Sequence, residues 1–505
     1  METIGHWIDG EQVTGPAADG LPVYDPATGQ QTARVLTAGP DEVKAAVEAA
    51  KRAQMAWKQS SLAERTAVMF AFHDLVAGAR DRLAQLVTSQ HGKVFSDAQG
   101  EVARGLECIE YACGAGEILK GSFSRQVSTG VDVHSVREAL GVVAGITPFN
   151  FPVMVPLWMI PNALVAGNGF ILKPSERDPA PSLVLAELLA QAGLPDGVFN
   201  VLQGDRVAVD ALLDHPDVAA VSFVGSTRAA EHVYQRGTAA GKRVQALGGA
   251  KNHMVVLPDA DLGAAANAAV SASCGSAGER CMAVSVVVTV GSIADELVER
   301  IKAGMQGLRV APGSDPAADM GPLVTGEHRD RVATYIDTGR DEGADVVLDG
   351  RQMPSPGTGF FLGPTLLDHV NPAMNVYRDE IFGPVLSVVR AEDLDEALEV
   401  VNGNPYGNGV AIFTSDGEAA RRFEAGVQVG MVGVNVPIPV PVGYYSFGGW
   451  KSSLFGASAM YGEEGLRFYT RAKVVTSRWS ARPASRPELH FQAAAETAEK
   501  PAPGR

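Results

Sequence analysis

One cysteine in the chain has the neighbours that a nucleophile needs. Cys281 directly follows Arg280 in the run 278–282 (GERCM), after a helix-compatible stretch at 264–273 and before a β-branched run at 284–290. A thiol attacks only as a thiolate, and a nearby cation or helix N-terminus lowers its pKa into a reactive range. We therefore expect a reactive Cys281 with a lowered pKa. On this segment alone, the alternative is a small buried hydrophobic residue.

Polar residues and glycine end or follow three apolar, strand-like runs further upstream. The runs cover 142–146, 169–173 and 218–224, and the residues concerned are Thr147, Asn150, Lys173, Glu176, Gly225 and Ser226. Helix-like stretches alternate with these runs, which indicates a doubly wound parallel sheet. Such sheets bind ligands beyond the carboxyl ends of their strands, so these residues predict a nucleotide site.

The remaining chain supplies the elements that must position these groups. We expect helices at 40–59, 62–78, 81–90 and 96–114, a hairpin at 122–137, strands at 284–290, 345–348 and 385–389, and helices at 294–305, 326–342, 394–402 and 417–426. This pattern predicts an α/β protein with one domain at 1–120 and 138–249 and a second at 250–447. Residues 121–137 and 465–478, with a strand over 466–475, are interpreted as a small β arm. Residues 481–505, rich in Ala, Pro, Arg and Glu, are interpreted as a disordered tail.

Composition excludes several classes of function. The chain has 505 residues, and its net charge of −16 argues against nucleic acid or an anionic membrane as the main partner. The sequence contains no run of about 18 apolar residues, so we expect no membrane span. The N-terminus has no signal-peptide pattern. Four cysteines do not form a disulfide framework, so we expect a cytoplasmic protein. The histidines and carboxylates show no zinc or EF-hand spacing, so no metal is expected.

Five motifs, in this order, resemble the aldehyde dehydrogenase superfamily over nearly the whole chain up to about Trp479. They are TPFNFP at 147–152, KPSE at 173–176, FVGST at 223–227, GERC at 278–281 and EIFGP at 380–384. Three further runs, at 249–253, 278–282 and 433–441, are similar to the branch of CoA-acylating methylmalonate- and malonate-semialdehyde dehydrogenases. The resemblance implies a doubly wound NAD-binding domain, an α/β catalytic domain and an oligomerisation arm. A homotetramer is expected, with a dimer as the alternative.

The resemblance also implies a role for each candidate residue. Cys281 would attack the aldehyde to give a thiohemiacetal, and Asn150 would donate to its oxyanion; an ordinary helix N-cap is the alternative for Asn150. NAD would accept the hydride, and its site would comprise Thr147, Phe149, Lys173, Glu176, Gly225, Ser226, Glu380 and Phe382. Within this set, Lys173 and Glu176 would hold the adenosine ribose. The carboxylate of Glu176 would repel a 2′-phosphate, which favours NAD over NADP.

The chain lacks the glutamate that hydrolytic members of the superfamily use in the second half of the reaction. Hydrolytic relatives have a Glu-Leu-Gly-Gly-Lys run whose Glu activates water, and here that position falls on Leu247 or Ala246, depending on the alignment. Neither side chain accepts a proton, so we expect coenzyme A to take the acyl group. Two alternatives stay open. One is a hydrolytic enzyme with another base, for which Glu279 is the nearest carboxylate. The other is a nucleotide-binding or scaffold protein without turnover.

The substrates of this branch carry a carboxylate beside the aldehyde. Arg280 and Arg104 are the candidates for holding it, because a guanidinium pairs with a carboxylate through two parallel hydrogen bonds. Arg280 could instead only tune the thiol, and Arg104 could be a surface arginine. Phe447 is the one aromatic residue assigned to the substrate tunnel. The resemblance implies loss of CO₂ to give propionyl-CoA or acetyl-CoA, and leaves valine, thymine and inositol breakdown open as pathways.

Overall fold

The computed structural model describes residues 2–15 and 20–479. The predicted disordered tail at 481–505 lies outside the described residues. The chain divides into two compact units, the first made of residues up to Leu119 with Glu138–Arg471, and the second of Lys120–Arg137 with the chain from Ala472 onward. All the site residues predicted from the sequence lie in the first unit.

The first large sheet has the doubly wound arrangement that the sequence predicts. Its eight strands lie in the order β22-β12-β11-β8-β9-β10-β2-β3, and β12 to β10 are all parallel. Their bounds are β2 His6–Ile8, β3 Glu11–Val13, β8 Val142–Ile146, β9 Gly169–Lys173, β10 Phe199–Val201, β11 Val218–Val224, β12 Arg243–Leu247 and β22 Leu454–Phe455. The short strands β22, β2 and β3 are antiparallel additions at its edges.

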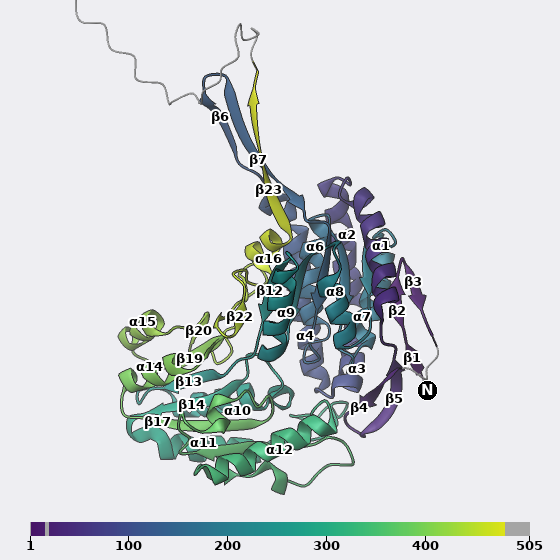
Figure 1. Cartoon of the computed structure of the whole chain (residues 1–505). Coiled ribbons are helices and arrows are strands. Elements are labelled where there is room, and N and C mark those ends of the chain that lie inside the picture. The colour runs from purple at the N-terminus through teal and green to yellow at the C-terminus, as the bar shows by residue number, and fades with distance from the viewer. Residues whose placement is uncertain (1, 16–19, 480–505) are drawn as a thin grey trace, which may run out of the picture. The chain divides into compact units, whose positions relative to one another are not determined.

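Helices cover both faces of this sheet (Figure 1). One face packs against α1 (Pro40–Trp57), α8 (Arg206–Asp214) and α9 (Thr227–Ala239). The other face packs against α6 (Met154–Val165) and α7 (Ala180–Gln191). Behind these lie α2 Leu62–Gly78, α3 Arg80–His91, α4 Phe95–Cys113 and α5 Ala115–Ile118. Alternate side chains of β8 enter the two cores, because successive residues of a strand point to opposite faces.

The second large sheet has seven strands in the order β15-β16-β17-β14-β13-β19-β20. Their bounds are β13 Asn252–Val256, β14 Val284–Val290, β15 Asp345–Leu348, β16 Thr365–Asp368, β17 Val385–Ala391, β19 Gly409–Phe413 and β20 Met431–Val434. Its helices are α10 Leu262–Cys274, α11 Ala294–Gln306, α12 Gly326–Asp341, α13 Asn375–Arg378, α14 Leu394–Gly403 and α15 Gly417–Gly426. Only β14, β15 and β17 were predicted as strands; the other four are short and contain glycine, alanine or polar residues.

The smaller sheets include the predicted hairpin. Strands β6 (Phe123–Ser128), β7 (Val131–Ala139) and β23 (Thr470–Arg478) form a three-stranded sheet in the order β23-β7-β6. The remaining strands pair as β1-β5-β4 and β18-β21, with bounds β1 Glu2–Ile4, β4 Leu21–Asp25, β5 Gln30–Val35, β18 Tyr406–Gly407 and β21 Trp450–Lys451. The strand predicted over 466–475 was wrong at its start. Residues Gly462–Phe468 form helix α16, which buries Leu466 against α6.

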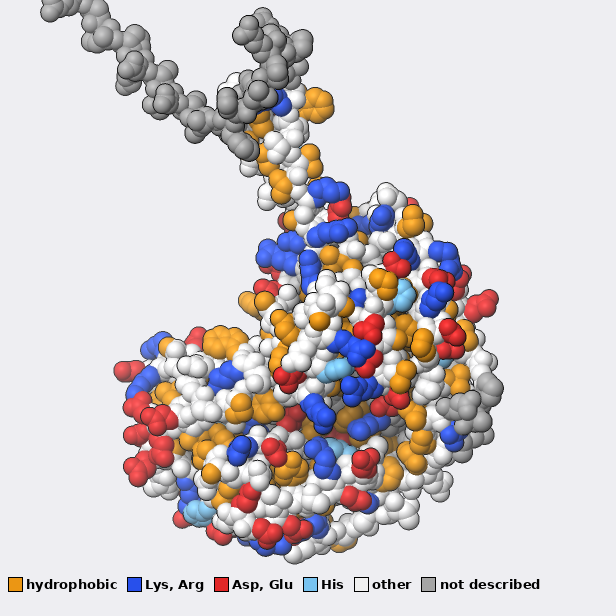
Figure 2. Space-filling model, viewed as in Figure 1, with side chains coloured by type: hydrophobic (Ala, Val, Ile, Leu, Met, Phe, Trp, Pro, Cys, Tyr) orange, Lys and Arg blue, Asp and Glu red, His pale blue; other side chains and the backbone are white. Residues whose placement is uncertain are grey.

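Charge is spread unevenly over the surface. On the face in Figure 2, basic and acidic side chains alternate over most of the first unit, whereas acidic side chains gather over α14 and α15. Acidic residues on or at the start of these two helices include Asp395, Glu396, Asp416 and Glu418. Across the part of the chain that the structure describes, no helix combines the length and the apolar character needed to cross a membrane.

Candidate active site

The loop that presents Cys281 has an unusual backbone. Helix α10 ends at Cys274, and Ser276, Ala277 and Gly278 then adopt left-handed φ angles of 53°, 51° and 75° in succession. A Cβ atom on Gly278 would lie 2.3 Å from the carbonyl oxygen of Gly383, so only glycine lets the 380–384 segment approach the loop so closely. Backbone held in sparsely populated regions often marks a functional site.

Two cavities meet at Cys281, and between them they collect most of the predicted site residues. One cavity, of about 500 Å³, is lined by Phe149, Asn150, Gly225, Ser226, Glu380 and Phe382 together with Cys281. The other, of about 520 Å³, is lined by Arg104, Arg280 and Phe447 together with Cys281. Five of the predicted cofactor residues and all three predicted substrate residues therefore approach Cys281 from separate cavities.

The remaining predicted cofactor residues lie where two neighbouring strands end. The backbone N–H of Thr147, after β8, donates to the carbonyl of Lys173, which ends β9, at 3.1 Å. Lys173 Nζ lies 3.1 Å from Glu176 Oε2. Although burial works against it, Lys173 lowers the pKa of the Glu176 carboxyl, so this group is ionised near neutral pH. These three residues do not line either cavity.

The geometry of the first cavity fits a dinucleotide. Gly225 and Ser226 follow β11 and lead into α9, whose first backbone N–H groups form an anion site. A Cβ on Gly249, beside this cavity, would lie 2.3 Å from Glu380 Oε2, so the chain there leaves no room for a side chain. Arg177 also lines the cavity, with its guanidinium 4.7 Å above the Phe149 ring. Sequence reasoning missed Arg177.

The second cavity is apolar apart from its charged residues on α4 and Arg280. Phe151, Trp158, Met154 and Met282 line it alongside Phe447, whose ring lies 4.9 Å from that of Trp158. Of these residues the sequence predicted only Phe447, because an aromatic residue of a tunnel has the same local pattern as one of the core. Arg280 Nη2 donates to Asp97 Oδ1 at 2.7 Å. Arg104 donates to both carboxylate oxygens of Glu107, at 2.7 and 2.9 Å, and to Pro441 O at 2.8 Å.

The expected activation of the thiol by Arg280 is wrong for this state. Burial, with the nearby Glu380 adding to it, raises the pKa of Cys281 to about 12, while Arg280 contributes the weakest lowering effect. Arg280 has little influence because Asp97 neutralises it. The other three cysteines are also free thiols. Burial raises the pKa of Cys108 to about 12 and those of Cys113 and Cys274 to about 11.

Asn150 is not a helix cap. Helix α6 begins at Met154 and its N-cap is Val153, so the alternative for Asn150 is excluded. Asn150 is buried, its side chain lines the first cavity, and its backbone carbonyl accepts a hydrogen bond from Lys93 Nζ at 2.8 Å. Lys93 in turn pairs with Glu101 on α4. Both charged residues escaped sequence analysis, although Asp97, Glu101, Arg104 and Cys108 recur at helical spacing on one stretch.

Neither of the two aligned positions nor Glu279 supplies the base that the chain lacks. Ala246 and Leu247, the two positions that alignment allows, are both apolar and buried in β12. Glu279 is fully buried and lines neither cavity; its Oε1 accepts from the backbone N–H of Val324 at 3.3 Å. Burial raises the pKa of Glu279 to about 8, so it is mostly protonated at neutral pH. Its carboxyl therefore does not face a water that could attack Cys281.

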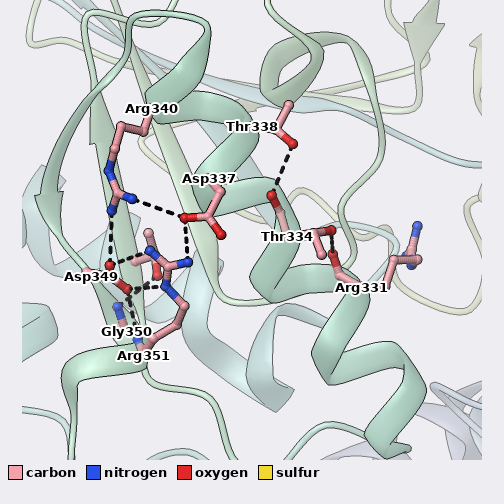
Figure 3. Close-up of polar contacts among 9 residues, drawn as sticks. Arg331, Thr334, Asp337, Thr338, Arg340, Asp349, Gly350 and Arg351 are labelled. Atoms are coloured by element: carbon pink, nitrogen blue, oxygen red, sulfur yellow. Dashed lines mark hydrogen bonds and ion pairs between the residues drawn. The ribbon is translucent and has the colours of Figure 1, made fainter.

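Helix α12 holds the segment that carries Glu380 and Phe382. His328 Nε2 donates to Phe382 O at 2.7 Å, and Arg331 Nη2 donates to Ile381 O at 3.0 Å. Further along the helix, ion pairs among Asp337, Arg340, Asp349 and Arg351 fix it to the 349–351 segment, while Arg331 points away from that cluster (Figure 3). The sequence predicted this helix but not its contacts with the site.

A family model described as the aldehyde dehydrogenase family matches residues 13–475 of the chain. The chain belongs to this family. The resemblance in its motifs is thus confirmed, and the fold agrees with that of aldehyde dehydrogenases of known structure. A structure of a proposed methylmalonate-semialdehyde dehydrogenase from Sinorhizobium meliloti, complexed with NAD, has a TM-score of 0.94 and 49% identity; the match covers 95% of this chain and 99% of that one.

Two curated relatives of the aldehyde dehydrogenase family are similar over nearly the whole chain. Malonate-semialdehyde dehydrogenase of Pseudomonas aeruginosa is 52% identical over 487 residues, which is 95% of this chain and 97% of the relative. The mitochondrial, acylating methylmalonate-semialdehyde dehydrogenase of Arabidopsis thaliana is 47% identical over 487 residues, covering 95% of this chain and 80% of the relative.

Replacing Glu380 with Gln should make Cys281 more reactive toward alkylation. A carboxylate near a thiol disfavours the thiolate, and burial raises the pKa of Glu380 itself to about 7, so this effect is present above pH 7. Removing the charge should move the pH profile of Cys281 alkylation by iodoacetamide to lower pH, with about tenfold faster labelling per pKa unit. Peptide mapping distinguishes Cys281 from the other thiols.

Glu327→Gln is the matched control for this measurement. Glu327 is an exposed carboxylate that lines the same cavity but has no part in the pKa shift of Cys281. Its labelling profile should match that of the wild type. A Glu380→Gln profile that stays in place or moves to higher pH would contradict the inferred coupling.

Proposed function

We propose that the protein is an NAD-dependent, CoA-acylating dehydrogenase of malonate or methylmalonate semialdehyde. The observation behind the proposal is Cys281 at the junction of two cavities, with no ionised carboxylate on β12 beside it to activate water. The names of the two curated relatives support the substrate class, and the acylating name of the plant relative supports CoA. Oxidoreductase chemistry with an aldehyde follows from the family.

Cys281 and Asn150 perform the first half of the reaction in this proposal. The Cys281 thiolate attacks the aldehyde carbon, and the carbonyl electron pair moves to oxygen, forming a thiohemiacetal oxyanion. The Asn150 side-chain N–H and the backbone N–H of Cys281 donate to that oxygen; losing such a donor typically costs ~10²–10³ in rate. NAD, when bound in the first cavity, would accept the hydride of the thiohemiacetal. The acyl group would then be held on Cys281 as a thioester. Glu380 and Phe382 would hold its nicotinamide ribose, and Lys173 and Glu176 its adenosine ribose.

Coenzyme A then accepts the acyl group. The CoA thiolate attacks the thioester carbon, a new carbon–sulfur bond forms, and the Cys281 thiolate leaves. A free thiol is a few per cent ionised at neutral pH and needs less help from a base than water does. Ala246 and Leu247 provide no such help, so water attack is slow. The carboxylate of the acyl group leaves as CO₂, and the enolate that remains takes a proton from solvent, which gives acetyl-CoA from malonate semialdehyde and propionyl-CoA from methylmalonate semialdehyde.

Arg280 and Arg104 would hold the carboxylate of the substrate in the second cavity. A guanidinium has five N–H donors, and the Arg280 side chain uses one of them on Asp97. Its other donors are available for a substrate carboxylate next to Cys281. Arg104 lines the same cavity from α4, and Phe447 would pack against the carbon chain.

A homotetramer in the cytoplasm completes the proposal. In the second unit, Phe123, Val127, Val136 and Val474 expose apolar surface. Strands β6 and β23 form the two edges of their sheet, and exposed edges and apolar surface together favour association with another chain.

An NADH assay with malonate and methylmalonate semialdehydes, with and without CoA, tests the proposal directly. With CoA, the wild type should turn over continuously and form acyl-CoA. Without CoA, it should give a burst of about one NADH per site followed by slow release. Cys281→Ala should give neither. Free acid formed at full rate without CoA would support the hydrolytic alternative, and absence of any burst would support a protein without turnover.

Arg280→Leu and Arg104→Leu should each lose activity with semialdehydes but not with propanal. A charge-assisted pair contributes roughly 1.5–3 kcal/mol, so kcat/KM for the semialdehyde should fall by about 10- to 100-fold. Propanal has no carboxylate and serves as the internal control in the same assay. Equal losses with both substrates would instead assign Arg280 to the structure of the loop before Cys281 and Arg104 to the packing of α4 against Pro441.

Glu176→Gln should weaken the preference for NAD over NADP. The ionised carboxylate accepts hydrogen bonds from free ribose hydroxyls and repels a 2′-phosphate, whereas Gln does neither as strongly. The ratio of kcat/KM for the two cofactors should fall by about tenfold or more, since hydrogen bonds to charged groups are worth roughly 1.5–3 kcal/mol. An unchanged ratio would remove Glu176 from cofactor selection.

A further inference from the structure

A fully buried ion pair lies directly behind the proposed oxyanion donor. Lys93 Nζ lies 2.7 Å from Glu101 Oε2, and neither side chain is exposed. Two charges removed from water are costly unless additional hydrogen bonds satisfy them. Both groups have such bonds, and all of them go to the segment that contains Asn150.

The pair holds this segment at two points. Lys93 Nζ donates to the backbone carbonyl of Asn150 at 2.8 Å. Glu101 Oε1 accepts from the backbone N–H groups of Val153 and Met154, at 2.8 and 3.1 Å, at the start of α6. A negative charge at a helix N-terminus is favourable. Lys93 also lies 4.1 Å above the centre of the Phe151 ring. The backbone on both sides of Phe151 is thereby fixed, and with it the direction of the Asn150 side chain.

Lys93 reaches this position because of the turn that precedes it. Helix α3 ends at His91, and its C-cap residue Gly92 has a φ of 94° and would place a Cβ only 2.7 Å from Pro322. Asp178, another buried carboxyl close to the pair, does not compete for the lysine. Burial, with Glu101 adding to it, raises the pKa of Asp178 well above its usual value and favours the neutral form.

The same face of α4 also contacts the nucleophile loop. Asp97 is one turn before Glu101 on α4, and it accepts from Arg280, the residue before Cys281. One helix therefore holds the segment of the oxyanion donor through Glu101 and the segment of the nucleophile through Asp97. The distance between these two segments is therefore set by the spacing of Asp97 and Glu101 on one rigid helix.

We propose that Lys93 and Glu101 are positioning residues that hold the Asn150 amide at the oxyanion of the thiohemiacetal. Both side chains are fully buried, and although Glu101 lies in the wall of the second cavity, the pair acts through the backbone of Asn150 and the start of α6. The inference rests on the proposed function, because it needs an aldehyde addition step at Cys281.

A double-mutant cycle with Asn150 tests the proposal. Glu101→Gln, Lys93→Met and Asn150→Ala are each made alone, and each of the first two is combined with Asn150→Ala. The rate of the single-turnover NADH burst with a saturating semialdehyde is measured for all five variants and the wild type. Glu101→Gln and Lys93→Met should each slow the burst by about tenfold or more, part of the ~10²–10³ that a lost donor costs. In the Asn150→Ala background they should slow it by less than about twofold, because residues that act through one group are not additive.

Alkylation of Cys281 by iodoacetamide separates positioning from a general disturbance of the site. This displacement develops no oxyanion at the Asn150 amide, so its rate should be unchanged in Glu101→Gln and Lys93→Met. Lys242→Met is the matched control, since Lys242 is also a buried lysine that donates to backbone carbonyls, those of His215 after α8 and Val218 at the start of β11. It should lower the Tm without changing the burst rate. Glu101→Gln keeps an acceptor for the start of α6, and provides the test if Lys93→Met does not fold.

Two results would overturn the proposal. One is an equal slowing of the burst with and without the Asn150 side chain, and the other is a loss of Cys281 alkylation in step with the burst. Absence of a burst in the wild type would instead contradict the proposed function, so the two failures are distinguishable.

Discussion

The buried pair of Lys93 and Glu101 is the interaction on which the arrangement of the site depends. It joins the turn after α3, the middle of α4 and the start of α6, three segments that the chain brings together from 93 to 154. A buried charge left without its partner costs several kcal/mol, about 3–5 in comparable cases, so the three segments are held together or lost together. Because Asp97 on the same helix binds Arg280, this constraint extends to the nucleophile loop of the second sheet.

The electrostatics of the site oppose the thiolate rather than favour it. Burial and Glu380 both raise the pKa of Cys281, and burial raises the pKa of Glu380 to about 7. A thiolate at Cys281 and a carboxylate at Glu380 therefore disfavour each other in one low-dielectric cavity. The arginine beside the cysteine does not relieve this conflict, because Asp97 already pairs with it. A change that neutralises Glu380, or engages it elsewhere, makes the thiol easier to ionise.

Short patterns in the sequence predicted the central strands of the first sheet and the motifs of the site. Apolar runs such as 142–146 and 218–224 gave the central strands, and short motifs gave Cys281 and the residues beyond the strand ends. The strands β13, β16, β19 and β20 escaped because their pairing, between segments up to about 160 residues apart, is what makes them strands. The Lys93 contact with Asn150 and the Asp97 contact with Arg280 span 57 and 183 residues, and no spacing rule reaches that far. The pKa of Cys281 was misjudged because burial is a property of the fold, not of the arginine next to it in the sequence.

Glu279 and Glu380, one beside Cys281 in the sequence and the other in the same cavity, explain why water is a poor competitor for the acyl group. Glu279 is adjacent to the nucleophile loop, but its side chain points into the protein, lines neither cavity and keeps its proton near neutral pH because burial raises its pKa to about 8. Raising the pH would ionise it without turning it toward a cavity. Glu380 does face the first cavity, where it accepts from the backbone N–H of Ala250, and it is the residue that the family resemblance assigns to the nicotinamide ribose. A carboxylate engaged with a ribose hydroxyl has fewer acceptor positions left for a water. Ala246 and Leu247 supply no proton acceptor either. The group that attacks the thioester must therefore be partly ionised already in solution, and a thiol meets that requirement whereas water does not.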